Sequence, residues 1–193
     1  MKRSVWPVIQ DYSDRLDPDP PHAQQVCRLS GMLFDDLRPL HHLPPDTRDL
    51  LKAAALLHDI GWSRADKPHH KASRDIILND TTMNLTSRER KIIALIARYH
   101  RKSHPRPDHA VFKELCEDDK QIVSWCSGIL RVADVLDRAH QNLVREIRCF
   151  ITSEEVVLSC TCKTPLYYDL PVFAEKSMLL QELTHRRICL SCT

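Results

Sequence analysis

The stretch that decides the fold of this chain is Ala53-Ala54-Ala55-Leu56-Leu57-His58-Asp59-Ile60-Gly61. Apolar residues recur at helical spacing from about residue 47 up to the doublet His58-Asp59, where Gly61 is expected to stop the helix. Asp46 or Thr47 is expected to cap its start. An apolar helix rarely ends in an imidazole and a carboxylate unless something binds there. Both groups are good ligands for a divalent metal, so the stretch predicts a buried helix that delivers two ligands at its C-terminal end.

The composition favours a helical domain with one good core. The chain has 193 residues with only three glycines, 42% hydrophobic residues and a net charge of +2. The sequence has no run of about 18 apolar residues, so no transmembrane helix is predicted. Residues 1–7 lack the apolar core of a signal peptide. We therefore expect a cytoplasmic protein with no membrane partner. The near-neutral charge also argues against a sequence-specific nucleic-acid partner.

Eight cysteines allow two interpretations. Without an export signal, disulfides are not expected. Cys160-x-Cys162 and Cys189-x-x-Cys192 could together form a four-thiolate zinc site, although the C-x-C spacing is unusual for zinc. Reduced thiols, buried or idle, are the favoured interpretation.

Hydrophobic periodicity predicts a mainly α fold with a small C-terminal α+β element. Helices are expected over residues 22–40, 47–58, 69–78, 86–100, 110–115 and 118–142. Thr86 and Glu89 predict a capping box at the start of the fourth helix. A β-hairpin (145–151 and 156–162), a helix (171–185) and a last strand (186–191) are expected to follow. The chain thus divides into a lead-in over 1–19, a helical metal-binding domain over 20–142 and an α+β tail over 143–193 packed on it.

Further potential metal ligands lie far apart in the sequence, on other predicted helices. They are His22, His69 or its neighbour His70, His100 and Asp134. In a chain with 11 histidines, a single histidine is usually an ordinary surface or core-edge side chain. We interpret His41, His42, His109 and His185 in that way, and His104 is a weaker candidate because proline follows it. The ordered set, in contrast, indicates a metal site.

The ligand types indicate a catalytic rather than a structural site. One metal could be held by His22, His58, Asp59 and Asp134, whose mixed nitrogen and oxygen donors leave positions open for water. His69 and His100 are available for a second metal, with Asp59 as the natural bridge. The set suits one or two ions of Mn²⁺, Fe²⁺, Co²⁺, Ni²⁺ or Zn²⁺, and it suits Mg²⁺ less well.

Many basic residues lie near the candidate metal ligands in the sequence. The candidates for binding substrate phosphate are Lys71, Arg101, Lys102 and Arg138. They could form a ring that receives an anionic, phosphorylated ligand, or they could belong to solvated helix faces, with Arg138 paired to Asp134 one turn earlier. The dense cluster at residues 98–102 favours the phosphate interpretation. Asp137 is expected to support a ligand side chain rather than to bind metal itself.

The early histidine, the His58-Asp59 doublet and the distant Asp134, on separate helices, resemble the HD superfamily of metal-dependent phosphohydrolases. The resemblance implies an HD helical bundle over residues 20–142. It also favours His69 over His70, because the superfamily pattern has a histidine four residues before a small residue, here Ser73.

Five motifs carry a closer resemblance. They are His22-Ala23-x-x-Val26, Leu57-His58-Asp59-Ile60-Gly61, His69-His70-Lys71-x-Ser73, Ala97-Arg98-Tyr99-His100-Arg101-Lys102 and Leu130-Arg131-x-Ala133-Asp134-x-Leu136-Asp137-Arg138-x-His140. Together with the tail motif Phe173-Ala174-Glu175-Lys176-Ser177, they look like the C-terminal domain of the exopolyphosphatase/guanosine-pentaphosphate phosphatase (Ppx/GppA) family, over about residues 12–190. The resemblance implies a phosphorylated small molecule or polyphosphate as ligand, and it allows for a homodimer. In that family the polyphosphate-cleaving site lies in N-terminal actin-like domains, whose Gly-rich phosphate loop has no counterpart in this sequence.

The residues and the resemblance together predict a metal-dependent phosphohydrolase that acts on a phosphoester or phosphoanhydride of a nucleotide or polyphosphorylated substrate. Asp59, His100 and Arg101 are the residues expected to carry catalysis. Two alternatives stay open at this point. One is a regulatory module that binds metal and a nucleotide or polyphosphate without turnover, and the other is an interaction domain with vestigial ligands.

Overall fold

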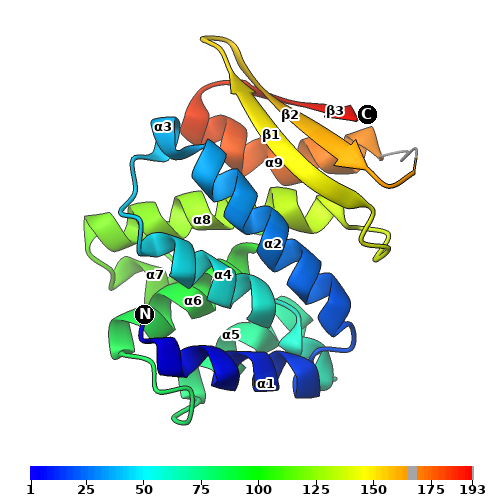
Figure 1. The fold of residues 1–193 in the computed structure, drawn as a ribbon. Helices are drawn as coiled ribbons and strands as arrows, with labels where there is room; N and C mark the ends of the chain where they lie inside the picture. Colours follow the sequence, from blue (N-terminus) through cyan, green and yellow to red (C-terminus); the bar gives the residue numbers. More distant parts are fainter. Residues whose placement is uncertain (165–168, 193) are drawn as a thin grey trace.

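Helices form most of the chain, as the periodicity predicts, and a small sheet is added at the C-terminal end (Figure 1). The structure is a computed structural model that describes residues 1–164 and 169–192. The helices are α1 (Trp6–Leu16), α2 (Pro20–Asp36), α3 (Arg38–His41), α4 (Thr47–Leu57), α5 (His69–Asn79), α6 (Ser87–Tyr99), α7 (Ala110–Lys113), α8 (Glu117–Leu136) and α9 (Leu170–Thr184). Two 3₁₀ turns, η1 (Arg3–Val5) and η2 (Ile60–Ser63), precede α1 and follow α4. In the described part of the chain, no helix has both the length and the apolar character needed to cross a membrane.

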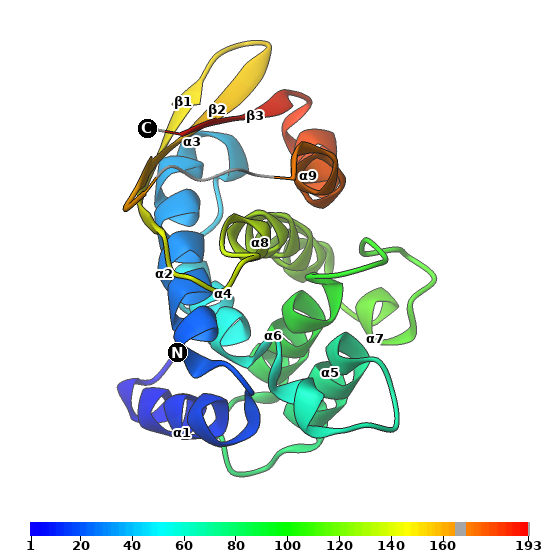
Figure 2. The ribbon, with the colours of Figure 1, turned by 90° about the vertical axis from the view of Figure 1, so that its right-hand side faces the viewer.

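Helix α8 lies in the middle of the fold and packs against α2, α4, α6 and α9 (Figure 2). Its buried residues, among them Ile122, Cys126 and Ile129, are spread around the whole helix, as expected for a helix enclosed by others. Acidic residues at 117–119 in its first turn complement the positive end of the helix dipole. The helix carries Asp134 in its last turn, so this carboxylate is delivered to the interior of the bundle.

The helices around α8 place several of their ends close together. His22 lies in the first turn of α2, His58 follows the end of α4, His69 is the first residue of α5, and His100 follows the end of α6. α4 packs on α6, and α6 packs on α5. Because the last residues of α4 and α6 are apolar and buried, the polar side chains that follow them are held at the edge of the core.

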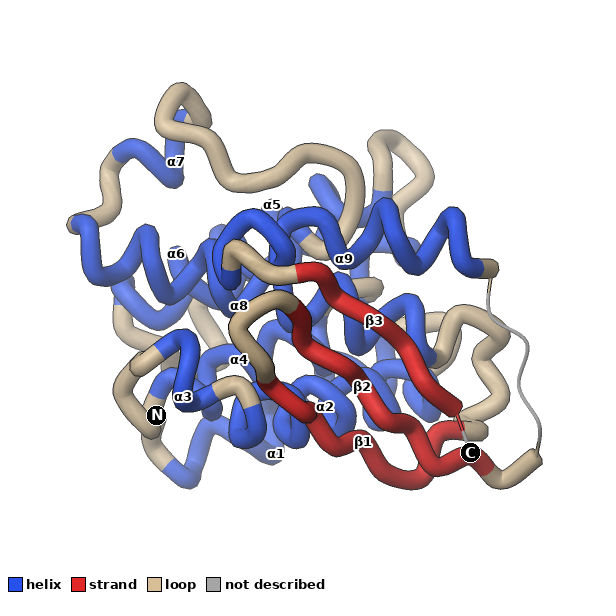
Figure 3. Tube along the Cα trace, turned by 90° about the horizontal axis from the view of Figure 1, so that it is seen from above, coloured by secondary structure: helices blue, strands red, loops and turns tan. Residues whose placement is uncertain are grey.

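A three-stranded sheet packs on α2 through its first strand (Figure 3). The strands are β1 (Val144–Ile151), β2 (Glu155–Cys162) and β3 (Arg187–Cys192), in that order across the sheet. β1 and β2 form the predicted antiparallel hairpin, with Ile147 opposite Cys160. β3 pairs with β2 in parallel, with Val156 opposite Ile188, and α9 makes the crossover between them. Since α9 also packs on α8, the tail is attached to two of the helices that carry candidate ligands.

The N-terminal segment 1–19, described above as a lead-in, contains helix α1. Val5, Ile9 and Ser13 follow one another at helical spacing and are buried. Through this stripe α1 packs against α4 and η2. The helix is hard to predict because only a narrow stripe of it is apolar, and polar residues cover the rest.

Helix α8 ends at Leu136, not at Asn142 as predicted. The C-cap residue Asp137 accepts a hydrogen bond from the backbone N–H of Asn142, 2.8 Å away, which turns the chain back onto the helix end. His140 and Asn142 adopt left-handed backbone conformations within this turn. The side chain of Asp137 therefore ends the helix earlier than its apolar pattern suggests.

The predicted start signals are partly right. The capping box of Thr86 and Glu89 is confirmed, since both of its reciprocal hydrogen bonds are present. Asp46 occupies the N-cap of α4, but its side chain makes no cap hydrogen bond. The predicted helix to residue 40 is divided, because α2 ends at Asp36 and the separate α3 starts at Arg38 with a proline in its first turn.

Gly61 does not stop a helix, contrary to the prediction. α4 ends at Leu57, and Gly61 lies in η2 without a positive φ. A Cβ atom at this position would stand 2.1 Å from the carbonyl oxygen of His69 and 2.5 Å from the backbone nitrogen of Ser73. Glycine is therefore required for close approach of two backbones, which ties the turn after α4 to the start of α5.

Candidate metal centre

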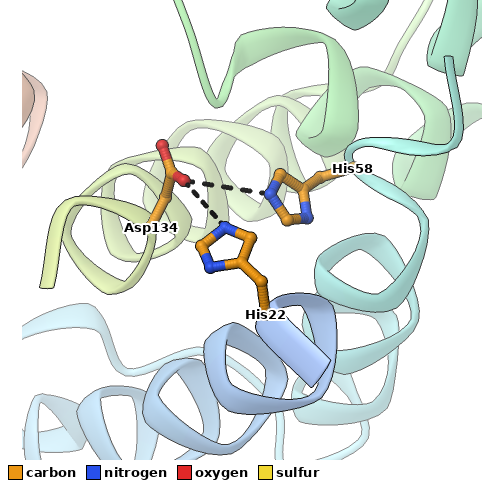
Figure 4. A group of neighbouring side chains, drawn as sticks. All are labelled: His22, His58 and Asp134. Carbon is orange, nitrogen blue, oxygen red and sulfur yellow. Dashed lines mark ion pairs between the residues drawn. The ribbon is translucent and has the colours of Figure 1, made fainter. Parts of the chain in front are cut away.

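The first group of candidate ligands consists of His22, His58 and Asp134, drawn in Figure 4. Their donor atoms lie within 4.8 Å of one another. The Oδ1 atom of Asp134 is 3.5 Å from Nε2 of His22 and 3.9 Å from Nε2 of His58. We call these three residues the first triad. Three segments that are far apart in sequence supply it, namely α2, the end of α4 and α8.

The second group consists of Asp59, His69 and His100, and we call it the second triad. Oδ1 of Asp59 is 3.4 Å from Nε2 of His69 and 3.6 Å from Nε2 of His100. The two imidazole nitrogens are 3.2 Å apart. All three donor atoms are therefore aimed at one small volume next to the end of α4.

Asp59 lies between the two triads. While its Oδ1 atom faces the second triad, its Oδ2 atom is 3.6 Å from Nε2 of His58 in the first. A carboxylate with one oxygen toward each of two groups is the usual bridge in two-metal sites. The doublet on which the sequence prediction rests thus contributes one residue to each triad.

Hydrogen bonds fix the ring orientation of three of the histidines. Nδ1 of His58 and of His100 lies 2.7 and 2.6 Å from the carbonyl oxygens of Ala55 and Ala97, each three residues earlier. A carbonyl oxygen can only accept, so Nδ1 donates, and Nε2 is the ring nitrogen that faces the site. Nδ1 of His22 is 2.8 Å from Oδ2 of the buried carboxylate that ends α8. This second contact is typical of metal-binding histidines, and it joins Asp137 to a candidate ligand side chain, as expected.

Three buried polar atoms in the centre have no hydrogen-bond partner. They are Nε2 of His22, Nε2 of His58 and Oδ1 of Asp59. Buried groups of this kind are costly when they are left unpaired, so three of them in two adjoining triads need an explanation. A divalent cation in the first triad would satisfy the two imidazole nitrogens, and one in the second triad would satisfy the carboxylate oxygen. The residues present therefore fit one or two metal ions.

Burial and the neighbouring charges shift the pKa values in the centre. Burial holds the pKa of His100 well below its ordinary value and lowers the pKa of His69, which keeps both rings neutral, as metal ligands must be. Burial would by itself raise the pKa of Asp134, but the nearby Lys176 and His22 hold it well below its ordinary value. Burial also opposes protonation of His22, yet the neighbouring carboxylates of Asp134 and Asp137 raise its pKa to about 10. This ring therefore binds a proton strongly when no metal competes for it.

The structure separates His69 from His70. Nε2 of His69 belongs to the second triad, whereas His70 belongs to neither. The buried ring of His70 lies edge-on to His69, with its Nδ1 atom unpartnered, and burial lowers its pKa to about 4, with Arg98 adding to the effect. The geometry thus favours the residue that the sequence pattern favours. Ser73, four positions after this candidate ligand, accepts a hydrogen bond from the N–H of Gly61, which packs closely against it.

Three other histidines make contacts away from the two triads. His41 is buried, with Nε2 2.8 Å from the carbonyl oxygen of Phe34. His104 lies 3.3 Å from a carboxylate oxygen of Glu182, and His109 is hydrogen-bonded to the Tyr99 hydroxyl. The two triads, which are the groups of possible metal ligands found among the described residues, contain no cysteine. The alternative of a four-thiolate zinc site is therefore not supported among the described residues.

A cavity of about 740 Å³ opens onto the centre. Its lining includes Asp59, His69, His100 and Asp134 from the two triads. Three of the four basic residues predicted to bind phosphate also line it, and these are Arg101, Lys102 and Arg138. Lys71 is exposed on α5 and is not among the lining residues, so the structure does not bring it together with the other three.

The cavity also contains residues to which the sequence analysis gave no role. Nζ of Lys176, on α9, lies 2.5 Å from Oδ2 of Asp134 and 3.2 Å from the carbonyl oxygen of His100. Asp134 thus pairs with Lys176, whereas one of the two interpretations of the sequence paired it with Arg138. The sequence contains a tail motif around Lys176, but no local spacing indicates that the tail folds back onto α8.

A histidine at the cavity mouth was also missed. The ring of His140 stacks on His22 with centroids 3.8 Å apart, and its Nδ1 is 2.9 Å from Oδ2 of Asp19. Asp19 in turn caps α2 by accepting from the backbone N–H of His22. Because residues 137–142 were predicted to be helical, this contact across the turn could not be foreseen.

Comparison with protein families adds one finding. The family model described as Ppx/GppA phosphatase, domain III, matches residues 8–185. The chain belongs to this family. The matched residues of this Ppx/GppA domain include both triads, the basic residues at the cavity and α9. The close agreement with the resemblance found over residues 12–190 confirms that assignment and relates the chain to phosphatases. No curated protein gives a significant match.

Proposed function

We propose that this Ppx/GppA domain is a metal-dependent phosphohydrolase of the HD type that hydrolyses a phosphoester or phosphoanhydride. The observation that carries the proposal is the pair of triads joined by Asp59, with unpartnered donor atoms facing a cavity lined by basic side chains. The order of ligands, with a histidine, a His-Asp doublet and a distant aspartate on separate helices, supports the HD assignment. Family membership supports phosphate chemistry.

In this proposal the six triad residues hold one or two divalent ions of Mn, Fe, Co, Ni or Zn. Such ions, when bound, provide a nucleophile at neutral pH and reduce the negative charge on phosphate oxygens. The protein's own residues do the rest. Asp59 connects the two positions, and the rings of His58 and His100 are held in place by Ala55 and Ala97. Since these contacts exist before any ligand arrives, the site is preorganised.

The basic side chains determine where phosphate would lie. Arg101 and Lys102 follow His100 directly and are exposed at the cavity rim, while Arg138 lies on another part of the wall. Lys176 is nearer the centre and only 13% exposed. Charge-assisted hydrogen bonds from these groups would orient an anionic substrate over the metal positions and neutralise charge that develops during hydrolysis.

One observation favours the alternative of a binding module without turnover. Lys176 forms an ion pair with Asp134, and the ammonium group supplies positive charge where a metal would otherwise do so. A site that uses Lys176 in this way could hold a nucleotide or polyphosphate by charge alone. The two functions differ in whether phosphate is released.

The proposal is tested by measuring phosphate release. Wild-type protein would be stripped with a chelator, reloaded separately with each of the five metals, and incubated with phosphomonoesters, nucleotides and inorganic polyphosphate. We expect release that requires the metal and is abolished by Asp59→Ala, while Asp66→Ala, a change of an exposed carboxylate, keeps the wild-type rate. Tight binding of one of these compounds without release would support the binding module, and release that persists at full rate in excess chelator would contradict both.

A further inference from the structure

A large exposed aromatic side chain lies at the cavity. Trp62 is 55% exposed. The other large apolar side chains with comparable exposure in the described chain, Phe150, Leu170 and Met178, do not line this cavity, whereas Trp62 does. Exposing an indole to water is unfavourable, and an exposed apolar group at a binding cavity is commonly a contact for a ligand.

The indole is held in a fixed orientation. It stacks on the ring of His69, with centroids 4.3 Å apart and an angle of 16° between the planes. His69 is itself 7% exposed and positioned in the second triad. Because one face of the indole is covered by the imidazole and more than half of the side chain is still exposed, the opposite face is open to the cavity. The site thus offers a rigid, flat, apolar surface beside its metal positions.

Charge and apolar surface are arranged for two different parts of one ligand. Arg101 and Lys102 follow the second-triad residue His100, and Trp62 stacks on its second-triad partner His69. A volume of about 740 Å³ accommodates a ligand with a ring and a phosphate group. A chain of phosphates has no apolar face, so it would use only the charged part of this surface.

We propose that Trp62 is a stacking platform for a flat aromatic ring, and that it makes the site prefer a phosphate attached to a heteroaromatic base over a phosphate without one. This inference rests on the proposed function, because it assigns the substrate class of that same site. Stacking of a base on an aromatic side chain would strengthen binding of the base-bearing ligand about 10- to 100-fold. A purine, with its two fused rings, covers more of the indole than a pyrimidine does.

The test uses two ligands that differ only in the base. Adenosine 5′-monophosphate and ribose 5-phosphate would be titrated calorimetrically into metal-loaded wild-type protein and into Trp62→Leu and Trp62→Phe. Phe150→Leu, which removes a ring of similar exposure on β1, is the matched control. Metal content would be measured for each variant, because loss of the stack could also disturb His69.

We expect Trp62→Leu to weaken the binding of adenosine 5′-monophosphate about 10- to 100-fold, while the affinity for ribose 5-phosphate stays within about twofold of wild type. Trp62→Phe should keep most of the affinity that Trp62→Leu loses, and Phe150→Leu should change the affinity for neither ligand. Equal weakening of both ligands would mean that Trp62 only supports His69 and would overturn the proposal, as would wild-type protein that binds the two ligands equally. Base-dependent binding without phosphate release would leave the platform in place and refute hydrolysis. Metal-dependent phosphate release from adenosine 5′-monophosphate and ribose 5-phosphate at equal rates, unchanged in Trp62→Leu, would do the reverse.

Discussion

Replacing Gly61 by alanine should damage the second triad through the backbone, without touching any candidate ligand. The added Cβ atom would lie 2.1 Å from the carbonyl oxygen of His69, 2.5 Å from the backbone nitrogen of Ser73 and 2.8 Å from its Oγ atom. Real Cβ contacts are essentially never shorter than 3.0 Å. The first turn of α5 would therefore have to retreat by about 1 Å, because two of the three opposing atoms are backbone and cannot rotate away.

That retreat has two measurable consequences. Overpacking of this kind costs about 3 kcal/mol of folding free energy, which lowers the Tm of a chain of this size by about 6–12 °C. It also breaks the hydrogen bond from the N–H of Gly61 to Ser73 and moves His69 away from Asp59, now 3.4 Å distant. Loss of ligand position on this scale should weaken metal binding at the second triad about 10- to 100-fold.

Thermal unfolding and metal titration of Gly61→Ala and Gly128→Ala would test this reasoning. Gly128 lies within α8, where a Cβ atom would meet α9 at 3.5 Å or more, an ordinary contact. Alanine there should be neutral or stabilise by about 0.5–1 kcal/mol, since glycine is unfavourable inside a helix. A Gly61→Ala protein that melts within about 2 °C of wild type and binds metal equally well would refute the argument that close backbone approach positions His69.

Two further predictions concern charge. Burial alone would lower the pKa of His22, but the carboxylates beside the ring raise it to about 10. A metal must therefore displace a proton from this ring. The affinity for metal should then rise by up to about tenfold per pH unit between pH 7 and 9. Titration calorimetry in buffers of different ionisation enthalpy should show proton release, and a flat affinity would contradict this. The double substitution Arg101→Gln with Lys102→Gln should weaken the binding of triphosphorylated ligands about tenfold at low salt and less at high salt. The metal content should be unchanged. The double control Lys2→Gln with Arg3→Gln removes the same charge from an exposed site, so equal effects would show that only net charge matters.

The parts of the fold that follow from sequence are those with strong periodicity. The apolar run before His58, the capping box at Thr86 and the alternating strands of the tail each fix a local structure, and the ordered ligands then indicate which helix ends must meet. Helix α1 was missed because its buried stripe, Val5, Ile9 and Ser13, is narrow and partly polar.

The rest of the candidate site depends on contacts between distant segments, which a local pattern cannot specify. Lys176 reaches Asp134 only because α9 crosses back over α8 between two parallel strands. His140 meets Asp19 only because Asp137 ends α8 early. Gly61 was given the wrong role for the same reason, since the atoms that require a glycine there belong to α5.

The central claim is that the two triads bind divalent metal, and elemental analysis of protein purified without chelator tests it most directly. Wild type, Asp59→Ala and Asp66→Ala would be compared after brief exposure to excess Mn²⁺ and removal of unbound ions. Because Asp59 faces both triads while Asp66 is 65% exposed and outside them, we predict up to two ions per chain in wild type and Asp66→Ala. Asp59→Ala should retain less than half of that content. Equal metal content in wild type and Asp59→Ala, or no bound metal in wild type at all, would contradict the account.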